Sequence, residues 1–455
     1  MQILLKRHFL EKIFVNFDLM NFKKELIKNI LYKGLNVFLS FGITIVMVRL
    51  LGTEGNGVYS LFITNAAIIT LVISFSFNSG LVYYSAKKNF APATLINSSF
   101  LILLIQTVII VIAEIIFTSA FKISLFSDIH SAEISFWGCF YLFSVLLNGY
   151  VSAIFTGNKW FDILNLLTAA SNFIFLLIFG YLLLQNHGNS MAYTIFIIKI
   201  FISLTALQSV VYLIVLLKKI NFTFYADILK FKELRLIFMY AGVAFFSNLF
   251  QFLAYRMDYW FVNIYRSKSE LGLYALASKL NQVLWLLPMT IAAVIIPFTV
   301  ASSEEIGEKV KTILRLQFSG YILMAVLLCI LAPFFIPFIF GTGFRDAMYP
   351  FIILLPGVII FTLTTILAAY FAGINRQDIN LKISFFCFFT IFIGDWILVP
   401  TYGMEGAAAA SCMGYTLSGI SSLYVFSRLS KSNFKELLIF RKKDFSRIKS
   451  LLAGK

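Results

Sequence analysis

GVYSL, at residues 57–61, returns as GLYAL at residues 272–276, an offset of 215 positions. FTGNKWFDI at 155–163 returns as FAGINRQDI at 371–379, with Phe, Gly, Asp and Ile shared at an offset of 216. A near-constant offset at well-separated places is the signature of an internal repeat. The sequence therefore predicts two halves that share one architecture.

The composition indicates what the repeated unit is made of. Of the 455 residues, 60% are hydrophobic and only 13% are charged. Water-soluble globular domains do not have this composition, and apolar runs of about 20 residues, the length that crosses roughly 30 Å of hydrocarbon, recur along the chain. We therefore predict an all-α polytopic membrane protein with about twelve transmembrane helices. The predicted spans are 30–50, 57–77, 93–117, 132–156, 163–185, 191–217, 236–264, 272–298, 312–340, 347–371, 379–399 and 405–427.

Each half of the repeat holds six of these spans. Gly188 and Gly403, just before the sixth and twelfth spans, are again 215 positions apart. Because six is even, both halves cross the membrane the same way round, so a pseudo-two-fold axis along the membrane normal should relate them, with a cavity between them. The predicted divisions are a cytoplasmic N-terminal segment at 1–29, an N-terminal six-helix lobe at 30–217, a basic cytoplasmic linker at 218–235, a C-terminal six-helix lobe at 236–428 and a basic cytoplasmic tail at 429–455.

The basic charge of the chain follows this topology. Most of the 37 Lys and Arg residues lie in segments that are cytoplasmic if both termini are cytoplasmic, which is the orientation that the positive-inside rule favours. The net charge of +16 therefore does not indicate a nucleic-acid partner. The basic, amphipathic tail at 429–455 suits attraction to anionic membrane lipid, although a purely topological role for its charges is equally open.

The seventh span contains AYRMDYW, residues 254–260, with an arginine and an aspartate inside a membrane helix. At 100° per residue, the polar positions of this helix share about a third of its circumference, with Arg256 beside them. They are Ser247, Asn248, Gln251, Tyr255, Asp258 and Tyr259. Such a stripe is penalised in lipid, so we predict that it lines the cavity. The eighth span adds Ser278, Lys279, Asn281, Gln282 and Trp285, and the sixth adds Lys199.

Two interpretations of the charged residues remain open. Lys199, Arg256 and Lys279 could snorkel to the outer headgroups, with Asp258 as a local counter-ion. Alternatively, the three cations bind an anionic cargo, because arginine offers a fork of donors and lysine a point charge. Asp258 is too short to snorkel far, which favours a cavity role or coupling to a cation or proton. Two other acids lie nearer to span ends, where we expect interfacial solvation: Glu114 and Asp395.

Patterns typical of enzymes and metal sites are missing from the sequence. The three histidines lie outside the spans and far apart, and the four cysteines fall within spans without paired spacing. Neither a phosphate-binding GxxxxGK[ST] loop nor an HExxH motif is present. We therefore predict no catalytic residue, no metal site and no cofactor.

With the repeat and the polar stripe in view, residues 22–428 resemble the polysaccharide flippases. These exporters of O-antigen and related lipid-linked oligosaccharides belong to the superfamily that also holds the multidrug and toxin extrusion transporters and the lipid II flippases. Their first outer turn reads arginine, glycine, then glycine and an aromatic residue. Here RLLGTEGNGVYSL supplies Arg49, Gly52, Gly57 and Tyr59.

The second half of the chain carries the rest of the resemblance. An aspartate in the seventh helix is followed in the family by Gly-x-Tyr-x-x-Ala and a proline. This sequence supplies Asp258, Gly272, Tyr274, Ala277 and Pro288. FAGINRQDI followed by YGMEGAAAA at 402–410 matches the family near its end. These motifs are mostly structural, since glycines permit tight turns and close helix approach.

The resemblance implies a multidrug-and-toxin-extrusion-like fold and a flippase. It would move undecaprenyl-pyrophosphate-linked oligosaccharide repeat units, for O-antigen of lipopolysaccharide, capsule or a similar glycan, from the cytoplasmic to the outer leaflet of a bacterial inner membrane by alternating access. Arg256, Lys279 and Lys199 would face the pyrophosphate or sugar acids, and Asp258 would couple transport or act as a counter-ion. Further cavity residues would be Gln251, Tyr255, Asn248 and Gln282. The expected partners are this lipid-linked glycan and membrane lipid, with a polysaccharide polymerase or chain-length regulator left open.

Three alternatives are weighed against this function. A cation-coupled multidrug exporter should carry acidic residues deep in the N-terminal lobe, whereas the acids within its spans lie near span ends: Glu114, and Glu133 at the very start of its span. A lipid II flippase is disfavoured because such proteins have further C-terminal spans in place of this basic tail. A membrane polymerase or ligase needs a large outer loop, and the longest outer segment here, KISLFSDIHSAEI, is short.

Overall fold

The computed structural model describes residues 2–127, 132–185, 190–220, 228–301 and 303–439. Over these ranges the chain forms helices joined by short turns, and no strand occurs in them. The predicted repeat position Gly188 and residues 440–455 of the predicted tail lie outside the described residues. The all-α polytopic fold predicted from the sequence is confirmed.

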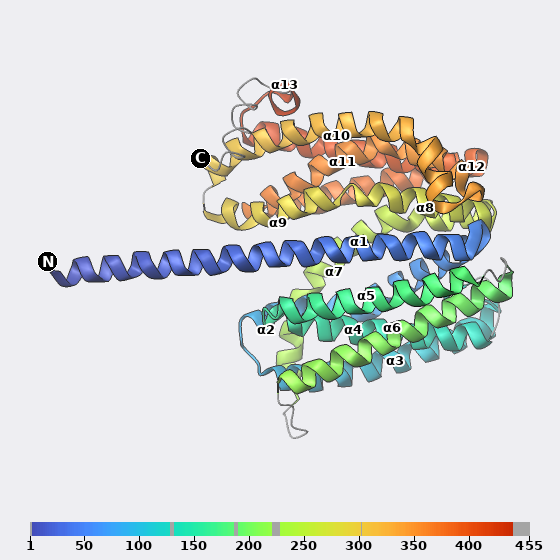
Figure 1. The fold of residues 1–455 in the computed structure, drawn as a ribbon, viewed down its shortest axis with the longest axis horizontal. Helices are drawn as coiled ribbons and strands as arrows, with labels where there is room; N and C mark the ends of the chain where they lie inside the picture. The colour runs from blue at the N-terminus through green and yellow to red at the C-terminus, as the bar shows by residue number, and fades with distance from the viewer. Residues whose placement is uncertain (1, 128–131, 186–189, 221–227, 302, 440–455) are drawn as a thin grey trace.

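Six helices make up the first lobe, which fills the lower half of the view in Figure 1 with α1 along its upper side. They are α1 (Gln2–Ser74), α2 (Phe77–Ala86), α3 (Pro92–Phe121), α4 (Ala132–Gly157), α5 (Phe161–Leu184) and α6 (Met191–Lys219). Their buried faces form two apolar clusters, a larger one to which α3 and α4 contribute most of the side chains and a smaller one between α1, α5 and α6.

The second lobe fills the upper half of the same view. Its elements are α7 (Phe231–Tyr265), α8 (Lys268–Val283), α9 (Leu286–Ala301), α10 (Ser303–Phe340), the 3-10 helix η1 (Thr342–Ala347), α11 (Met348–Gly373), α12 (Gln377–Leu429) and α13 (Phe434–Leu438). Its main core lies between α7, α8, α11 and α12.

Two of the long helices reverse direction at a glycine. Gly52 in α1 has φ 64° and ψ −174°, and Gly403 in α12 has φ 58° and ψ −134°. Residues with a side chain rarely adopt such positive φ values, whereas glycine does so at little cost. The predicted spans 30–50 and 57–77 therefore share α1, and the predicted spans 379–399 and 405–427 share α12.

The helices account for the predicted spans. Among the described residues, nine helices are long and apolar enough to cross a membrane. Since α1 and α12 each contain two arms, these nine cover eleven of the predicted spans. The remaining one, 272–298, corresponds to α8 followed by α9, each only 16 residues long.

Helix breaks occur at the end of one predicted span and in the middle of another. The second span, 57–77, ends at Phe75 and Ser76, which have φ 47° and 53°, and a further helix, α2, begins directly after them. The eighth span breaks at Leu284 and Trp285. Pro288 lies in the first turn of α9, where its missing N–H needs no partner, which explains why a new helix starts there.

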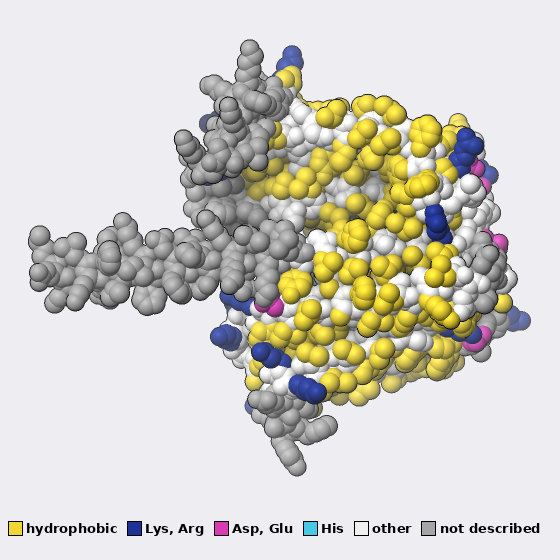
Figure 2. Space-filling model, in the orientation of Figure 1, with side chains coloured by type: hydrophobic (Ala, Val, Ile, Leu, Met, Phe, Trp, Pro, Cys, Tyr) yellow, Lys and Arg dark blue, Asp and Glu magenta, His cyan; other side chains and the backbone are white. Residues whose placement is uncertain are grey.

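The outer surface suits a lipid environment. Figure 2 shows hydrophobic side chains across the middle of both lobes, with Lys, Arg, Asp and Glu gathered toward the two ends of the helices. Large apolar side chains are exposed all along α3 and α10, including Leu104 at 59%, Ile115 at 60% and Leu323 at 75%. A surface of this kind is costly in water but favourable in hydrocarbon.

The helix α7 packs against both lobes. Ile237, near its start, is fully buried in the core of the first lobe, where its side chain packs on the backbone of Gly80 in α2. Tyr259 and Val262, near its end, belong to the core of the second lobe. Figure 1 shows α7 passing behind α1 from the lower to the upper group of helices. The boundary predicted at 236 divides the chain by the sequence repeat. In the structure, the start of α7 packs in the first lobe and its end packs in the second.

The lobes meet most closely at one end, which we call the turn end and define by residues 53–57 and 268–272. A Cβ atom on Gly57 would lie 1.9 Å from the carbonyl oxygen of Lys268, and one on Gly272 would lie 1.9 Å from that of Thr53. Asn56 also donates a 2.7 Å hydrogen bond to the Gly272 carbonyl. Gly57 and Gly272 are equivalent positions of the repeat, so each lobe contributes the same feature to this contact.

Candidate functional site

The helix α7 presents one polar face to the first lobe. Asn248 donates to Ser76 Oγ at 3.2 Å, and three turns further on Trp260 Nε1 donates to Asn65 Oδ1 at 2.7 Å. Positions four apart lie above one another on a helix. Arg256, midway along this row, therefore also lies on the side of α7 that faces the first lobe.

A cavity of about 370 Å³ lies between the lobes beside this face. Its walls come from α1, α2 and α4 of the first lobe and from α7. The polar residues that line it are uncharged: Thr70, Ser74, Ser76, Asn78, Tyr141 and Asn248. Phe252 and several aliphatic side chains complete the lining. Such walls can hydrogen-bond to hydroxyl groups and pack against an apolar ring face.

Two cations lie at the lobe boundary near this cavity, although neither lines it. Arg256, one turn beyond Phe252 on α7, donates hydrogen bonds to the Tyr259 hydroxyl and, at 3.2 Å, to Gln282 Oε1 of α8. The Lys279 ammonium of α8 lies 5.3 Å from the centre of the Tyr59 ring of α1. Lys279 thus points across the lobe boundary, within electrostatic range of Arg256. The structure brings Arg256, Lys279 and Gln282 together.

Lys199 lies apart from this pair. Its ammonium pairs with Glu133 of α4, inside the first lobe. It lines a small, mostly apolar cavity with Phe62 and Trp137 of the same lobe. Among the described residues, the contacts of Lys199 do not include Arg256 or Lys279.

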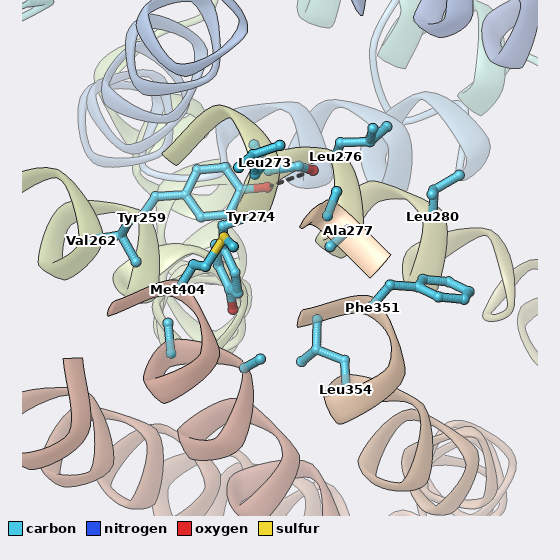
Figure 3. Close-up of a cluster of buried hydrophobic side chains, with 14 of the residues drawn as sticks. Tyr259, Val262, Leu273, Tyr274, Leu276, Ala277, Leu280, Phe351, Leu354 and Met404 are labelled. Atoms are coloured by element: carbon cyan, nitrogen blue, oxygen red, sulfur yellow. Dashed lines mark hydrogen bonds between the residues drawn. The ribbon is translucent and has the colours of Figure 1, made fainter. Parts of the chain in front are cut away.

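Asp258 lies on the opposite side of α7, inside the second lobe. It is only 1% exposed. Its carboxylate accepts hydrogen bonds from the Tyr274 hydroxyl of α8, from Ser411 Oγ of α12 at 3.2 Å and from the Tyr259 backbone N–H at 2.9 Å. In Figure 3, Tyr259 and Tyr274 stand side by side in the buried cluster around this position. The predicted stripe of α7 is therefore divided between two lobes.

Asp395 of α12 is the second buried carboxylate of this lobe. It is 0% exposed, and neither of its carboxylate oxygens has a hydrogen-bond partner among the described residues. It lies within electrostatic range of Asp258. The expected interfacial solvation of Asp395 is wrong, because the second arm of α12 packs tightly against it. An added Cβ on the neighbouring Gly394 would lie 2.7 Å from the Cβ of Ala410.

Gln251 and Tyr255 line a separate cavity of about 130 Å³ within the second lobe. Gln251 Nε2 donates to the Tyr255 hydroxyl at 2.9 Å. The other polar lining residues are Thr364, Thr365, Asn380, Ser384, Cys387 and Ser418. These two residues of the predicted stripe therefore do not face the cavity between the lobes.

The buried acid of the first lobe is fully engaged. Glu114 is 3% exposed and accepts hydrogen bonds from Ser124 Oγ at 2.7 Å, Ser135 Oγ at 2.5 Å and the Leu125 backbone N–H at 3.0 Å. The expected interfacial solvation of Glu114 is thus also wrong. The carboxylate instead ties the connection after α3 to the start of α4.

The motif residues have structural positions. Arg49 donates two hydrogen bonds of 2.6 Å to the carbonyls of Phe338 and Ile339, at the end of α10 in the other lobe. Gly52 makes the turn in α1, and Tyr59 lies under Lys279. The turn at Gly52 agrees with the structural role expected for the glycines of the motif. The partners of Arg49 and Tyr59 could not be predicted, because each is more than 200 positions away in the sequence.

Comparisons with known proteins support the fold. No protein-family model matches the chain, and no curated protein sequence matches it. A structure of the lipid II flippase MurJ in an inward closed conformation matches with a TM-score of 0.66 and 15% identity, covering 93% of this chain and 96% of that chain. An inward-facing multidrug resistance MATE family transporter of the MOP superfamily matches with a TM-score of 0.60 and 13% identity, covering 89% and 99%.

A third structure is a MOP superfamily transporter from Pyrococcus furiosus, described by the reverse polarity of its binding pocket. It matches with a TM-score of 0.59 and 15% identity, covering 89% of this chain and 94% of that chain. At these identities the likeness shows the architecture alone. The chain thus has the two-lobed membrane fold of the MOP superfamily.

Proposed function

We propose that the protein is a flippase that carries an undecaprenyl-pyrophosphate-linked oligosaccharide across a bacterial inner membrane by alternating access. The observation that carries this proposal is the placement of Arg256 and Lys279 at the lobe boundary, beside a cavity whose polar walls are uncharged. Its finer points, including the outward direction, the cytoplasmic termini and a polymerase partner, are part of the proposal and rest on the sequence.

The chemistry of these two regions matches the two polar parts of such a cargo. A pyrophosphate is held by the guanidinium fork of Arg256 and the point charge of Lys279. The saccharide meets amides and hydroxyls such as Asn78, Asn248 and Tyr141, which can donate and accept hydrogen bonds. The prenyl chain remains in hydrocarbon along the apolar outer surface. This transport needs no covalent chemistry.

Movement of the cargo requires the two lobes to separate at the turn end. There the contact of Gly57 with Gly272 leaves no room for a side chain, so the pathway is shut. Rocking of one six-helix lobe against the other would part these helix starts and close the opposite end. The bridging helix α7, anchored in both lobes, would bend or tilt during this movement.

We propose that the carboxylates of Asp258 and Asp395 couple transport to a proton or a monovalent cation. Two buried carboxylates in electrostatic contact cannot both stay charged without compensation. The oxygen donors around them, from Tyr274 and Ser411 as well as the two acids, suit either ion. The site lies on the far side of α7 from Arg256, so cargo and coupling ion would have separate sites on one helix.

A drug exporter of the same fold is the other candidate. Its cationic cargo would be repelled by Arg256 and Lys279. The carboxylate of Glu114, the buried acid of the first lobe, already accepts three internal hydrogen bonds. Both observations favour an anionic cargo.

The test is transport in proteoliposomes loaded with a radiolabelled undecaprenyl-pyrophosphate oligosaccharide. The readout is the fraction of the glycan that becomes accessible to a glycosidase on the other side. Arg256→Ala and Lys279→Ala should each lower the rate at least tenfold, about what the loss of one charged hydrogen bond costs. Lys199→Ala, a matched cation bound to Glu133, should leave the rate within twofold.

Unchanged transport in both Arg256→Ala and Lys279→Ala, with normal membrane insertion, would contradict the cargo site. Uptake of a cationic dye in place of the glycan would favour the drug exporter. Alternating access has its own test in the pair Thr53→Cys and Ser269→Cys, whose native hydroxyls lie 2.8 Å apart across the lobes. A disulfide there should stop transport, and a reductant should restore it.

A further inference from the structure

The 130 Å³ cavity of the second lobe has no role in cargo binding as proposed above. It lies between α7, α9, α11 and α12, and each of these helices except α9 contributes polar side chains to its lining. Thr364 Oγ1 is buried there without a hydrogen-bond partner among the described residues. A polar cavity of this size holds several water molecules. Gln251 and Met289, at its rim, are exposed.

Both arms of α12 lead from this cavity to the carboxylate pair. On the first arm, Ser384 and Cys387 lie on the same face as Asp395, two to three turns away. On the second arm, Ser418 lies on the same face as Ser411, which binds Asp258. At about 1.5 Å per residue, the seven or eight positions between cavity and carboxylates correspond to roughly 10–12 Å.

A cluster of four aromatic rings extends from the cavity toward the carboxylates. Tyr255 and Phe361 line the cavity, and Tyr415 lies within electrostatic range of Asp258. The ring centres of Tyr255 and Trp285 are 4.8 Å apart, those of Trp285 and Phe361 5.3 Å, and those of Phe361 and Tyr415 5.0 Å. Tyr415 lies between Ser418 and Ser411 along α12. Contacts of this kind exclude water as long as the rings stay packed together.

One of these rings lies at a break between two helices. Trp285 lies in the break between α8 and α9, and its indole N–H is buried without a hydrogen-bond partner among the described residues. Gln282, three residues earlier, accepts the hydrogen bond from Arg256. A change at the cationic cargo site therefore has a short route to this ring through α8.

We propose that this cavity is the hydrated vestibule through which the coupling cation or proton reaches Asp258 and Asp395, with the rings of Tyr255, Trp285, Phe361 and Tyr415 as its gate. The inference rests on the proposed coupling role of the carboxylate pair. It adds a route inside the second lobe that is separate from the cargo cavity between the lobes.

Cys387 offers a direct probe, because it lines the cavity and is only 2% exposed. The other three cysteines, Cys139, Cys329 and Cys412, are replaced by alanine. The full chain in proteoliposomes is treated with a small cationic methanethiosulfonate, a neutral reagent of the same size, or a bulky maleimide. We expect the small cation to modify Cys387 at least tenfold faster than the maleimide. Asp395→Asn should slow the cationic reagent but not the neutral one.

Filling the vestibule tests its function. Ser384→Leu, at a half-buried position, and Ser418→Leu, at a buried one, should slow Cys387 modification and ion-coupled transport at least tenfold. Thr390→Leu, at a half-buried position of the same helix that does not line the cavity, should change neither. Binding of the lipid-linked glycan should be the same in all three variants.

Two results would overturn the route. One is a Cys387 that no small reagent modifies, and the other is ion-coupled transport that persists in correctly inserted Ser384→Leu and Ser418→Leu proteins. The labelling needs no cargo, so it separates this inference from the proposed function. If Cys387 is labelled as expected but no lipid-linked glycan moves, the vestibule stands and the cargo assignment fails.

Discussion

Each lobe contains a buried carboxylate, and the two differ in what surrounds them. Glu114 of the first lobe is 3% exposed and accepts three hydrogen bonds. Asp395 of the second lobe is 0% exposed, has no hydrogen-bond partner among the described residues and lies near Asp258. A buried charge is tolerated when hydrogen bonds compensate it and costs several kcal/mol when they do not. The hydrogen bonds of Glu114 thus compensate its charge, whereas the carboxylate of Asp395 requires a proton or a cation.

This difference shows how an internal repeat can carry an asymmetric function. The halves share the glycine contact at the turn end, which is a backbone feature. The ion requirement belongs to the second lobe alone among the described residues, since it depends on side chains of α7 and α12. Substitutions at the two carboxylates should therefore affect different quantities.

The largest effect is expected for Asp395→Asn. The amide has nearly the same shape but lacks the negative charge that attracts a cation and cannot exchange a proton, so coupled transport should fall about 100-fold. Stability should be unchanged or higher, because an uncompensated buried carboxyl group is removed. Proteoliposome transport and thermal unfolding in detergent, measured on the same sample, check both. Full transport by Asp395→Asn would contradict the assignment of the ion requirement to the second lobe.

Glu114→Ala should show the opposite pattern. Three donors, from Ser124, Ser135 and the Leu125 backbone, lose their acceptor inside the first lobe, and each costs about 1 kcal/mol. We expect a loss of about 3 kcal/mol in the free energy of unfolding, with transport per folded molecule unchanged. Denaturant unfolding in detergent measures the loss. Ser135→Ala, which removes only one of the donors, should cost less. A transport defect without destabilisation would place Glu114 in coupling instead.

Arg49→Ala removes a side chain that donates its hydrogen bonds from the first lobe to the second. Its two bonds to the α10 carbonyls are short, but its side chain is exposed, so the expected loss is about 1 kcal/mol. Because these bonds hold the lobes together at the turn end, their loss should also speed disulfide exchange between Cys residues placed at Thr53 and Ser269. Arg49→Lys should not restore stability fully, since it cannot donate both bonds from a planar fork.

The smallest effect is expected at an exposed carboxylate. Asp378, at the start of α12, pairs with Arg376 at 2.8 Å, and both side chains are about half exposed. Exposed pairs contribute little because water competes for both partners. Arg376→Ala should leave transport and thermal unfolding indistinguishable from those of the unchanged protein. A measurable loss in either would contradict the expectation that an exposed carboxylate contributes less than a buried one.

Much of the fold could be predicted from apolar runs and the repeat. The predicted spans all fall on helices, and Gly57 and Gly272, found through the repeat, meet at the turn end. The break at Ser76 falls at the predicted end of the second span, 57–77. The break at Trp285 could not be predicted, because the apolar run continues through it and its position depends on packing between helices.

The site was less predictable than the fold. A helical wheel places Asn248 and Asp258 in one polar arc. Because α7 lies between the lobes, one edge of this arc faces the first lobe and the other edge faces the second. Asp395 lies near the end of a predicted span, yet α12 runs on past it to Gly403 and then folds back over it. A hydropathy profile locates apolar segments along the chain, but it does not show that a later segment packs over an earlier residue.

The sequence by itself determined a helical membrane protein with two similar halves, because a chain in hydrocarbon must satisfy its backbone hydrogen bonds within each apolar run. That requirement is local, so it can be read residue by residue. Only the tertiary structure decided that Lys279 faces Tyr59, that Glu114 is satisfied and that Asp395 is not. Partners of a buried side chain come from helices far away in sequence, and only packing brings them within bonding distance.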